Sequence, residues 1–122
     1  ALDPARERYV SLATFRRDGR EVRTPVWIAA AAGHHYVFSE TRAGKTKRIR
    51  ANGRARLAPC TVQGRITGEW FAATARLVSE PAVVARAYAA LRAKYGWQMR
   101  IIDWMSKLSG RYDARAIIEL DL

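Results

Sequence analysis

The chain has 122 residues, a length typical of one domain, and 49% of them are apolar, which is a globular composition. No apolar run reaches the roughly 18 residues of a membrane span, and the first residues hold no apolar signal core, so we expect one domain over 1–122, in the cytoplasm. The single cysteine, Cys60, excludes an internal disulfide and a cysteine-rich metal site. The net charge of +11 favours polyanionic partners, but an arginine-rich composition explains it as well as a nucleic-acid surface does.

The first part of the chain is predicted to form a β-hairpin. Residues 9–16 alternate in polarity and are rich in β-forming side chains, and residues 22–30 resume that pattern. Between them, Asp18-Gly19 predicts a two-residue turn in which both residues have positive φ. Pro25 lies inside the second strand and cannot donate to a ladder. One side of this strand must therefore be open, either at a sheet edge or towards a ligand.

A basic segment follows the third predicted strand. Gly33-His34 predicts a turn and residues 35–40 a strand, after which "SETRAGKTKRIRANG" (39–53) carries five cations: Arg42, Lys45, Lys47, Arg48 and Arg50. Their spacing is helical, so we predict a short helix over 45–51 that ends in a left-handed cap at Asn52-Gly53. The candidate partners of this basic segment are nucleic acid, an acidic membrane surface, a phosphorylated cofactor and plain solvent.

Two strands and two helices are predicted next. Residues 54–62 and 65–79 read as strands joined at Gln63-Gly64, with a bulge or bend at Gly68. Residues 80–95 read as a helix with Ser79 as its cap, Pro81 in its first turn and Gly96 at its end. Its core-facing stripe is Val84, Tyr88, Leu91 and Tyr95. A second helix over 97–109 places five large apolar residues on one face: Trp97, Ile101, Trp104, Met105 and Leu108.

The last segment, 114–122, is predicted to be a strand with Ile118, Leu120 and Leu122 on one side. The expected fold class is therefore mainly β with α: about six antiparallel strands, one short helix and two longer ones. Strands of this length close best as a small barrel, because closure removes exposed edges.

Side chains suited to catalysis are scarce. His34 and His35 fall in a predicted turn and point to opposite faces, and no Cys or acidic cluster is expected to accompany them, so we expect no metal site. Cys60 reads as a small buried apolar residue. Trp70 and Phe71 would permit base stacking, but consecutive strand residues face opposite ways, which disfavours a nucleic-acid platform. We name no catalytic residue; if the protein is an enzyme, a cofactor carries the reaction.

Four stretches, in the same order, resemble a known family. They are "YVSLATFRRDGREVRTPVW", "YVFSETRAGKTKRIRANGRARLAPC", "GRITGEWFAATARLV" and "LRAKYGWQ". The chain from about Tyr9 to Leu122 resembles the flavin/deazaflavin oxidoreductases with a split β-barrel like that of pyridoxamine 5'-phosphate oxidase. T-P-V-W followed by G-K-x-K-R is most similar to the actinobacterial subgroup that uses the deazaflavin coenzyme F420.

The resemblance implies a cofactor site and a homodimer. In such proteins the short basic helix holds the cofactor phosphate, here through Lys45, Lys47 and Arg48, aided by the positive end of the helix dipole. Ser39 would lie near the phosphate and ribityl chain. The strand that lines the ring with its backbone would be Thr24, Pro25, Val26 and Trp27.

Two departures separate the chain from vitamin B6 oxidases. Gly44-Lys45 stands where those enzymes have Arg-Lys, and the final strand lacks their Trp- and Arg-containing segment. The leading hypothesis is hydride transfer from reduced F420 to an unknown electrophilic small molecule. The alternatives are an FMN-dependent oxidoreductase of the same fold and a non-catalytic cofactor or nucleic-acid binder. A membrane partner is not expected.

Overall fold

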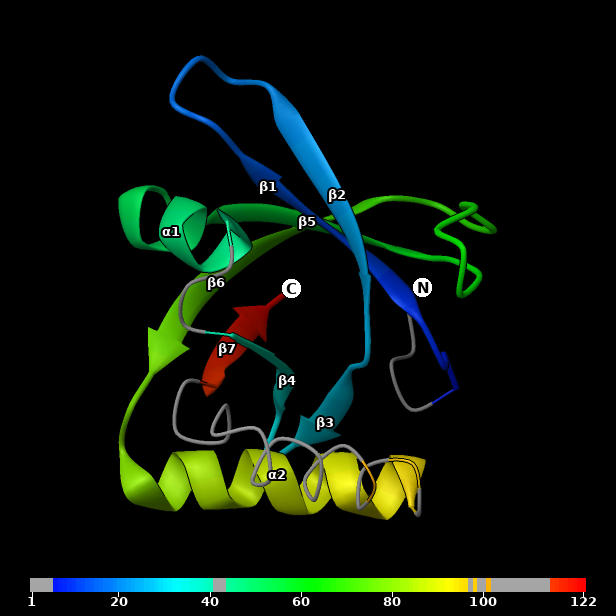
Figure 1. The fold of residues 1–122 in the computed structure, drawn as a ribbon, viewed down its shortest axis with the longest axis vertical. Helices are drawn as coiled ribbons and strands as arrows, with labels where there is room; N and C mark the ends of the chain where they lie inside the picture. Colours follow the sequence, from blue (N-terminus) through cyan, green and yellow to red (C-terminus); the bar gives the residue numbers. More distant parts are fainter. Residues whose placement is uncertain (1–5, 41–43, 97, 99–100, 102–114) are drawn as a thin grey trace.

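The described residues fold into one curled antiparallel sheet with two helices (Figure 1). The computed structural model describes residues 6–40, 44–96, 98, 101 and 115–122. The strand order is β2-β1-β5-β6-β7-β4-β3. The strands are β1 Val10–Phe15, β2 Glu21–Val26, β3 Ala29–Ala31, β4 His34–Glu40, β5 Arg54–Pro59, β6 Phe71–Val78 and β7 Arg115–Asp121, and the helices are α1 Gly44–Ala51 and α2 Pro81–Tyr95.

The sheet closes on itself because its two outermost strands are consecutive in the sequence. The predicted strand 22–30 is in fact two strands, so the described residues hold seven strands instead of six. β2 pairs with β1 and β3 pairs with β4, at opposite ends of the strand order, yet only Trp27 and Ile28 separate them. The sheet must therefore curl, and the predicted barrel class is confirmed.

The hairpins lie where the sequence predicts them, but the geometry of their turns differs from the predicted geometry. The N–H of Arg16 donates to the carbonyl of Arg20 at 2.9 Å, and Gly19 alone has a positive φ, of 89°. The β1–β2 turn is thus a three-residue loop, and the predicted two-residue turn is wrong. Between β3 and β4 the turn residues are Ala32 and Gly33, both with positive φ, so His34 already belongs to the strand.

Two apolar clusters hold the fold, one on each face of the sheet. The interior is filled by side chains from six strands, their connections and α1: Val10, Leu12, Val26, Ile28, Val37, Ile49, Ala55, Leu57, Ala75, Ile118 and Leu120. On the outer face α2 packs against β3, β4, β6 and β7, where its residues Tyr88, Leu91 and Tyr95 are buried as predicted. Ile49 closes the interior at the α1 end, so α1 acts as a plug for the barrel.

The caps of both helices partly contradict the sequence reading. α1 is confirmed, but Gly53 has no left-handed φ. A Cβ on Gly53 would lie 2.8 Å from the Ala75 carbonyl oxygen, so glycine is needed there for close approach to β6. Ser79 does not cap α2: Glu80 occupies the cap position without a side-chain hydrogen bond, while Pro81 and Gly96 take their predicted places.

The segment between β5 and β6 forms a turn and a bend rather than a long strand. Gly64 donates its N–H to Thr61, Cys60 and Ile66 make an isolated bridge, and the chain bends at Gly68, so β6 starts only at Phe71. The predicted helix over 97–109 lies outside the described residues, except for Gln98 and Ile101, which are helical. In β7, Ile118 and Leu120 are buried as expected, but Leu122 follows the strand and is exposed.

Candidate functional site

β2 offers an open backbone edge around Pro25. In the described part of the chain β2 pairs only with β1, and Pro25 stands opposite Ser11. Hydrogen-bonded and non-hydrogen-bonded pairs alternate along an antiparallel ladder, and the Arg16–Arg20 pair is hydrogen-bonded. The Ser11–Pro25 pair is therefore of the other kind, and the missing N–H of Pro25 costs the ladder nothing. The backbone groups of Arg23 and the carbonyl of Pro25 point outward, as the predicted open side requires.

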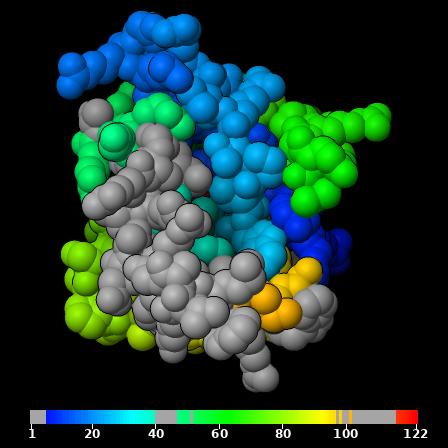
Figure 2. Space-filling model, viewed as in Figure 1, coloured from blue at the N-terminus to red at the C-terminus, as the bar shows by residue number. Residues whose placement is uncertain are grey.

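A basic pocket lies between the β1–β2 hairpin and α1. It has a volume of about 520 Å³ and is lined by Phe15, Arg16, Arg17, Asp18, Arg20, Lys47 and Arg48. Figure 2 shows the hairpin at the top of the view, with α1 close beside it. Of the seven lining residues that the structure describes, five are cations and one is a carboxylate, which already binds Arg20 at 2.7 Å. The pocket is thus suited to an anion.

Arg48 is the half-buried cation of this pocket. Its Nε donates to Oγ1 of Thr14, a side chain that is only 1% exposed, at 2.6 Å. Burial, and then the nearby Arg16 charge, lower the pKa of Arg48. Like charges held together cost free energy unless an anion stands between them, so the pair favours an anionic ligand.

Ser39 is buried at the end of β4 with an unused hydroxyl. It is 6% exposed, and its Oγ has no hydrogen-bond partner among the described residues. Buried hydroxyls nearly always find a partner, so an orphaned one needs an explanation. A ligand oxygen near the end of β4 would supply it.

The remaining predicted site residues are placed as follows. Thr24, Pro25 and Val26 lie on β2, with the Val26 side chain in the interior cluster, and Trp27 lies in the bend after β2. Lys45 lies in the first turn of α1, but its side chain falls outside the described part. Among the predicted site residues whose side chains are described, Lys47 and Arg48 line the basic pocket, and Ser39 and 24–27 do not.

The sequence reading missed the hairpin half of the pocket. Arg16, Arg17 and Arg20 surround the Asp18-Gly19 turn in "RRDGR", which the sequence alone marks only as a turn. A cluster of arginines at a loop tip was the available signal, but nothing local says that the loop faces α1.

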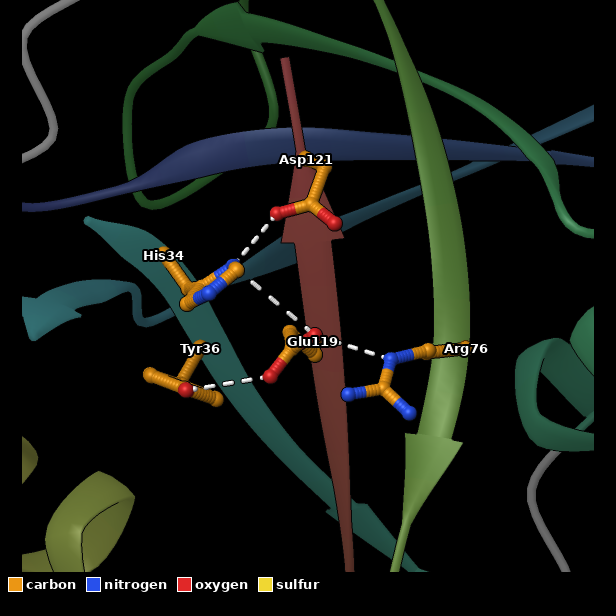
Figure 3. Close-up of polar contacts among 5 residues, drawn as sticks. All are labelled: His34, Tyr36, Arg76, Glu119 and Asp121. Atoms are coloured by element: carbon orange, nitrogen blue, oxygen red, sulfur yellow. Dashed lines mark hydrogen bonds and ion pairs between the residues drawn. The ribbon is translucent and has the colours of Figure 1, made fainter. Parts of the chain in front are cut away.

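His34 has acidic partners, so the expectation that no acidic cluster accompanies it is wrong (Figure 3). Its Nδ1 lies 2.6 Å from Oδ1 of Asp121 and 3.8 Å from Oε1 of Glu119. Glu119 is 3% exposed, and its two oxygens accept from Arg76 at 2.8 Å and from the Tyr36 hydroxyl at 3.0 Å. Three residues that could bind a metal meet here, but Arg76 already neutralises the buried carboxylate of Glu119. The group reads as a salt-bridge cluster.

Two other candidates are occupied within the chain. The guanidinium carbons of Arg23 and Arg56 each lie 4.7 Å from the centre of the Trp70 ring, so that ring is engaged by cations of its own chain. Cys60 is buried, and burial raises the pKa of its thiol, which makes it a poor nucleophile. None of the helices in the described part of the chain is long and apolar enough to cross a membrane.

The sheet is antiparallel and curled, and a two-residue bend joins its two edge strands. With α1 as a plug and α2 outside, this arrangement is a split β-barrel. The sequence profile of the pyridoxamine 5'-phosphate oxidase family matches residues 4–122, nearly the whole chain. The protein belongs to this family. Among curated proteins, no sequence matches the chain significantly.

Solved structures repeat this fold at low sequence identity. A conserved hypothetical protein of Mycobacterium tuberculosis is similar with a TM-score of 0.70 and 20% identity, over 94% of this chain and 72% of that one. HutZ, a heme storage protein of Vibrio cholerae, has a TM-score of 0.74 and 16% identity, over 97% and 83%. A candidate pyridoxamine 5'-phosphate oxidase of Listeria innocua has a TM-score of 0.65 and 12% identity, over 97% and 86%. At these identities the likeness concerns the fold.

Proposed function

We propose that this protein binds a phosphate-bearing cofactor of the flavin class, with the phosphate between α1 and the β1–β2 hairpin and the ring along the open edge of β2. The observation that carries the proposal is the pocket in which five cations face one carboxylate. A dianionic phosphate would separate the Arg16 and Arg48 charges and replace their repulsion by two attractive contacts, which for phosphate are charge-assisted and short.

The chain also fits the rest of such a cofactor. The outward backbone groups of Arg23 and Pro25 are free of the β1 ladder and match the donor and acceptor edge of a pyrimidine-like ring. The buried Oγ of Ser39, which has no partner among the described residues, would be available to a ribityl oxygen. When bound, a flavin or deazaflavin supplies hydride transfer. The residues of the chain would bind and orient the cofactor and hold the substrate over its ring, and we assign no proton transfer to a side chain.

Within this class we propose coenzyme F420 as the cofactor, with FMN as the alternative. Arg17, Arg20 and Lys47 are exposed cations beyond what one phosphate needs. An acidic tail, which F420 has and FMN lacks, would meet them. The proposed activity is an F420-dependent oxidoreductase that reduces an electrophilic small molecule. We also propose a homodimer with two equivalent sites, which the family resemblance implies.

A binding titration tests this proposal. Wild-type protein and the variants Lys47→Ala and Arg17→Ala are titrated with F420, FMN and heme, and Arg65→Ala serves as the control because it removes an exposed arginine away from the pocket. We expect F420 to bind, and both pocket variants to bind it more weakly than wild type and the control. Tight FMN binding without F420 binding would move the proposal to the alternative. Binding of heme alone would overturn it.

A further inference from the structure

The bend between β2 and β3 has backbone groups that no strand satisfies. β2 stops at Val26 and β3 starts at Ala29, so Trp27 and Ile28 belong to neither ladder. The side chain of Ile28 is fully buried in the interior cluster, which leaves its N–H and carbonyl in a dry environment. Buried backbone groups of this kind need partners.

The C-terminal turn of α2 supplies those partners. The N–H of Ile28 donates to the hydroxyl of Tyr95 at 2.9 Å, and the carbonyl of Ile28 accepts from the ammonium of Lys94 at 2.6 Å. The Tyr95 hydroxyl in turn lies 2.8 Å from the carbonyl of Arg8, its nearest acceptor, and 3.1 Å from that of Ile28. Lys94 also donates to the carbonyl of Glu7. One helical turn thus joins the bend to the segment before β1.

The ring of Tyr95 holds the other residue of the bend. It stacks on the Trp27 ring with centroids 4.4 Å apart and planes 8° from parallel, and the Phe38 ring makes an edge-type contact with Trp27 at 6.2 Å. The bend is therefore fixed on both faces, with Ile28 inside the barrel and Trp27 against α2. Pro25 and the open edge of β2 lie only two residues before it.

We propose that Tyr95, assisted by Lys94, is a positioning residue that fixes the bend at Trp27-Ile28 and thereby sets the place of the open edge of β2 for the cofactor ring. The part about the ring rests on the proposed function, whereas the part about the bend does not. Tyr95 would affect binding of the ring and leave the phosphate pocket unchanged, because neither Trp27 nor Ile28 lines that pocket.

The test compares Tyr95→Phe with Tyr88→Phe. Tyr95→Phe keeps the ring that stacks on Trp27 and removes the hydroxyl. Tyr88→Phe removes a hydroxyl about two helical turns earlier on the same buried stripe of α2. Lys94→Met is the second variant, in case Tyr95→Phe folds poorly. Amide hydrogen exchange of the peptide over 24–29 reports on the bend, and titrations with F420 and FMN report on the ring. Competition by inorganic phosphate reports on the basic pocket.

We expect Tyr95→Phe, but not Tyr88→Phe, to raise exchange in 24–29 by roughly ten-fold and to weaken cofactor binding by a similar factor, since one buried hydrogen-bond node is lost. Competition by phosphate should stay unchanged, which a general loss of stability would not allow. Faster exchange with unchanged cofactor affinity would overturn the positioning role. Equal exchange in both variants would overturn the role of Tyr95 in the bend. Wild-type protein that binds neither cofactor would overturn the proposed function and the ring part, and the exchange arm would still decide the bend.

Discussion

Arg48 and Thr14 bind each other at the rim of the barrel, through a 2.6 Å hydrogen bond from Nε to Oγ1. The contact ties α1 to β1 across 34 residues of sequence, and it gives a half-buried guanidinium its only hydrogen-bond acceptor among the described residues. Arg48 therefore serves both the fold and the proposed phosphate site. A variant of Arg48 would confuse these two roles, whereas a variant of Thr14 separates them.

Thr14→Val should lower the free energy of unfolding by about 1–3 kcal/mol, because it keeps the shape of the side chain but leaves the half-buried Nε of Arg48 unpaired. Urea denaturation measures the loss. Thr74→Val is the matched control, since Thr74 is an exposed strand residue. Equal stability of the two variants would show that the Arg48–Thr14 contact carries no weight.

Cofactor binding should depend on salt and on the length of an acidic tail. Each contact between a tail carboxylate and an exposed cation such as Arg17 or Lys47 is worth about 0.2–1 kcal/mol. Added salt weakens such exposed pairs, because the screening length is roughly 8 Å at physiological ionic strength and becomes shorter as salt is added. Calorimetry is done with long-tailed F420 and a tail-less analogue at low and high salt. We expect added salt to remove the affinity that the tail contributes before it removes the affinity that the phosphate contributes. If the two ligands bind equally at low salt, FMN becomes the preferred cofactor.

The protein should lose stability in alkali through Tyr95. Burial raises the pKa of Tyr95 to about 12, from its ordinary value of 10.0. The unfolded chain loses this proton above pH 10 while the folded chain keeps it, so the stabilisation is complete below pH 10 and is lost as the pH rises to about 12. The loss amounts to roughly 2–3 kcal/mol.

Denaturation of wild type and Tyr95→Phe at several pH values between 9 and 12 measures this effect. Other tyrosines and the lysines titrate in both proteins, so the difference between the two curves isolates Tyr95. The difference in the free energy of unfolding between wild type and Tyr95→Phe should narrow steadily above pH 10. Parallel curves would mean that Tyr95 is not protected from ionisation in the folded state.

A homodimer at micromolar concentration is the fourth prediction, and light scattering measures it. The family resemblance motivates it, together with the large apolar side chains predicted on one face of 97–109, which lie mostly outside the described residues. A monomer would remove the proposal of paired sites, because no second copy would then stand near the cofactor.

The sequence predicted those features that depend on neighbouring residues. Alternating polarity located most strands, Gly19 and Gly33 located two turns, and Pro81 with Gly96 bounded α2 within a residue. The apolar stripe of α2 was predicted because a helix repeats its faces every three or four residues. Pro25 predicted an open strand side, since a residue without an N–H excludes a ladder bond wherever it stands.

Features that depend on distant residues were not predictable in this way. At the bend that splits 22–30 into two strands, the N–H of Ile28 donates to the Tyr95 hydroxyl, 67 residues away. Asp121 lies 87 residues from His34, so the acidic partners of that histidine were invisible until β4 and β7 paired. The arginines of "RRDGR" became site candidates only once the barrel placed their hairpin beside α1.

The place of β7 in the sheet has a consequence for how the chain folds during its synthesis. β7 is the last strand in the sequence, yet it lies between β6 and β4. Until it arrives, β3 and β4 form a separate hairpin with no partner in the sheet, and both β6 and β4 expose an unpaired edge. The barrel can therefore close only after residues 115–121 have left the ribosome. A chain that stalls before β7 has emerged presents two unpaired strand edges to its neighbours, and these edges favour aggregation.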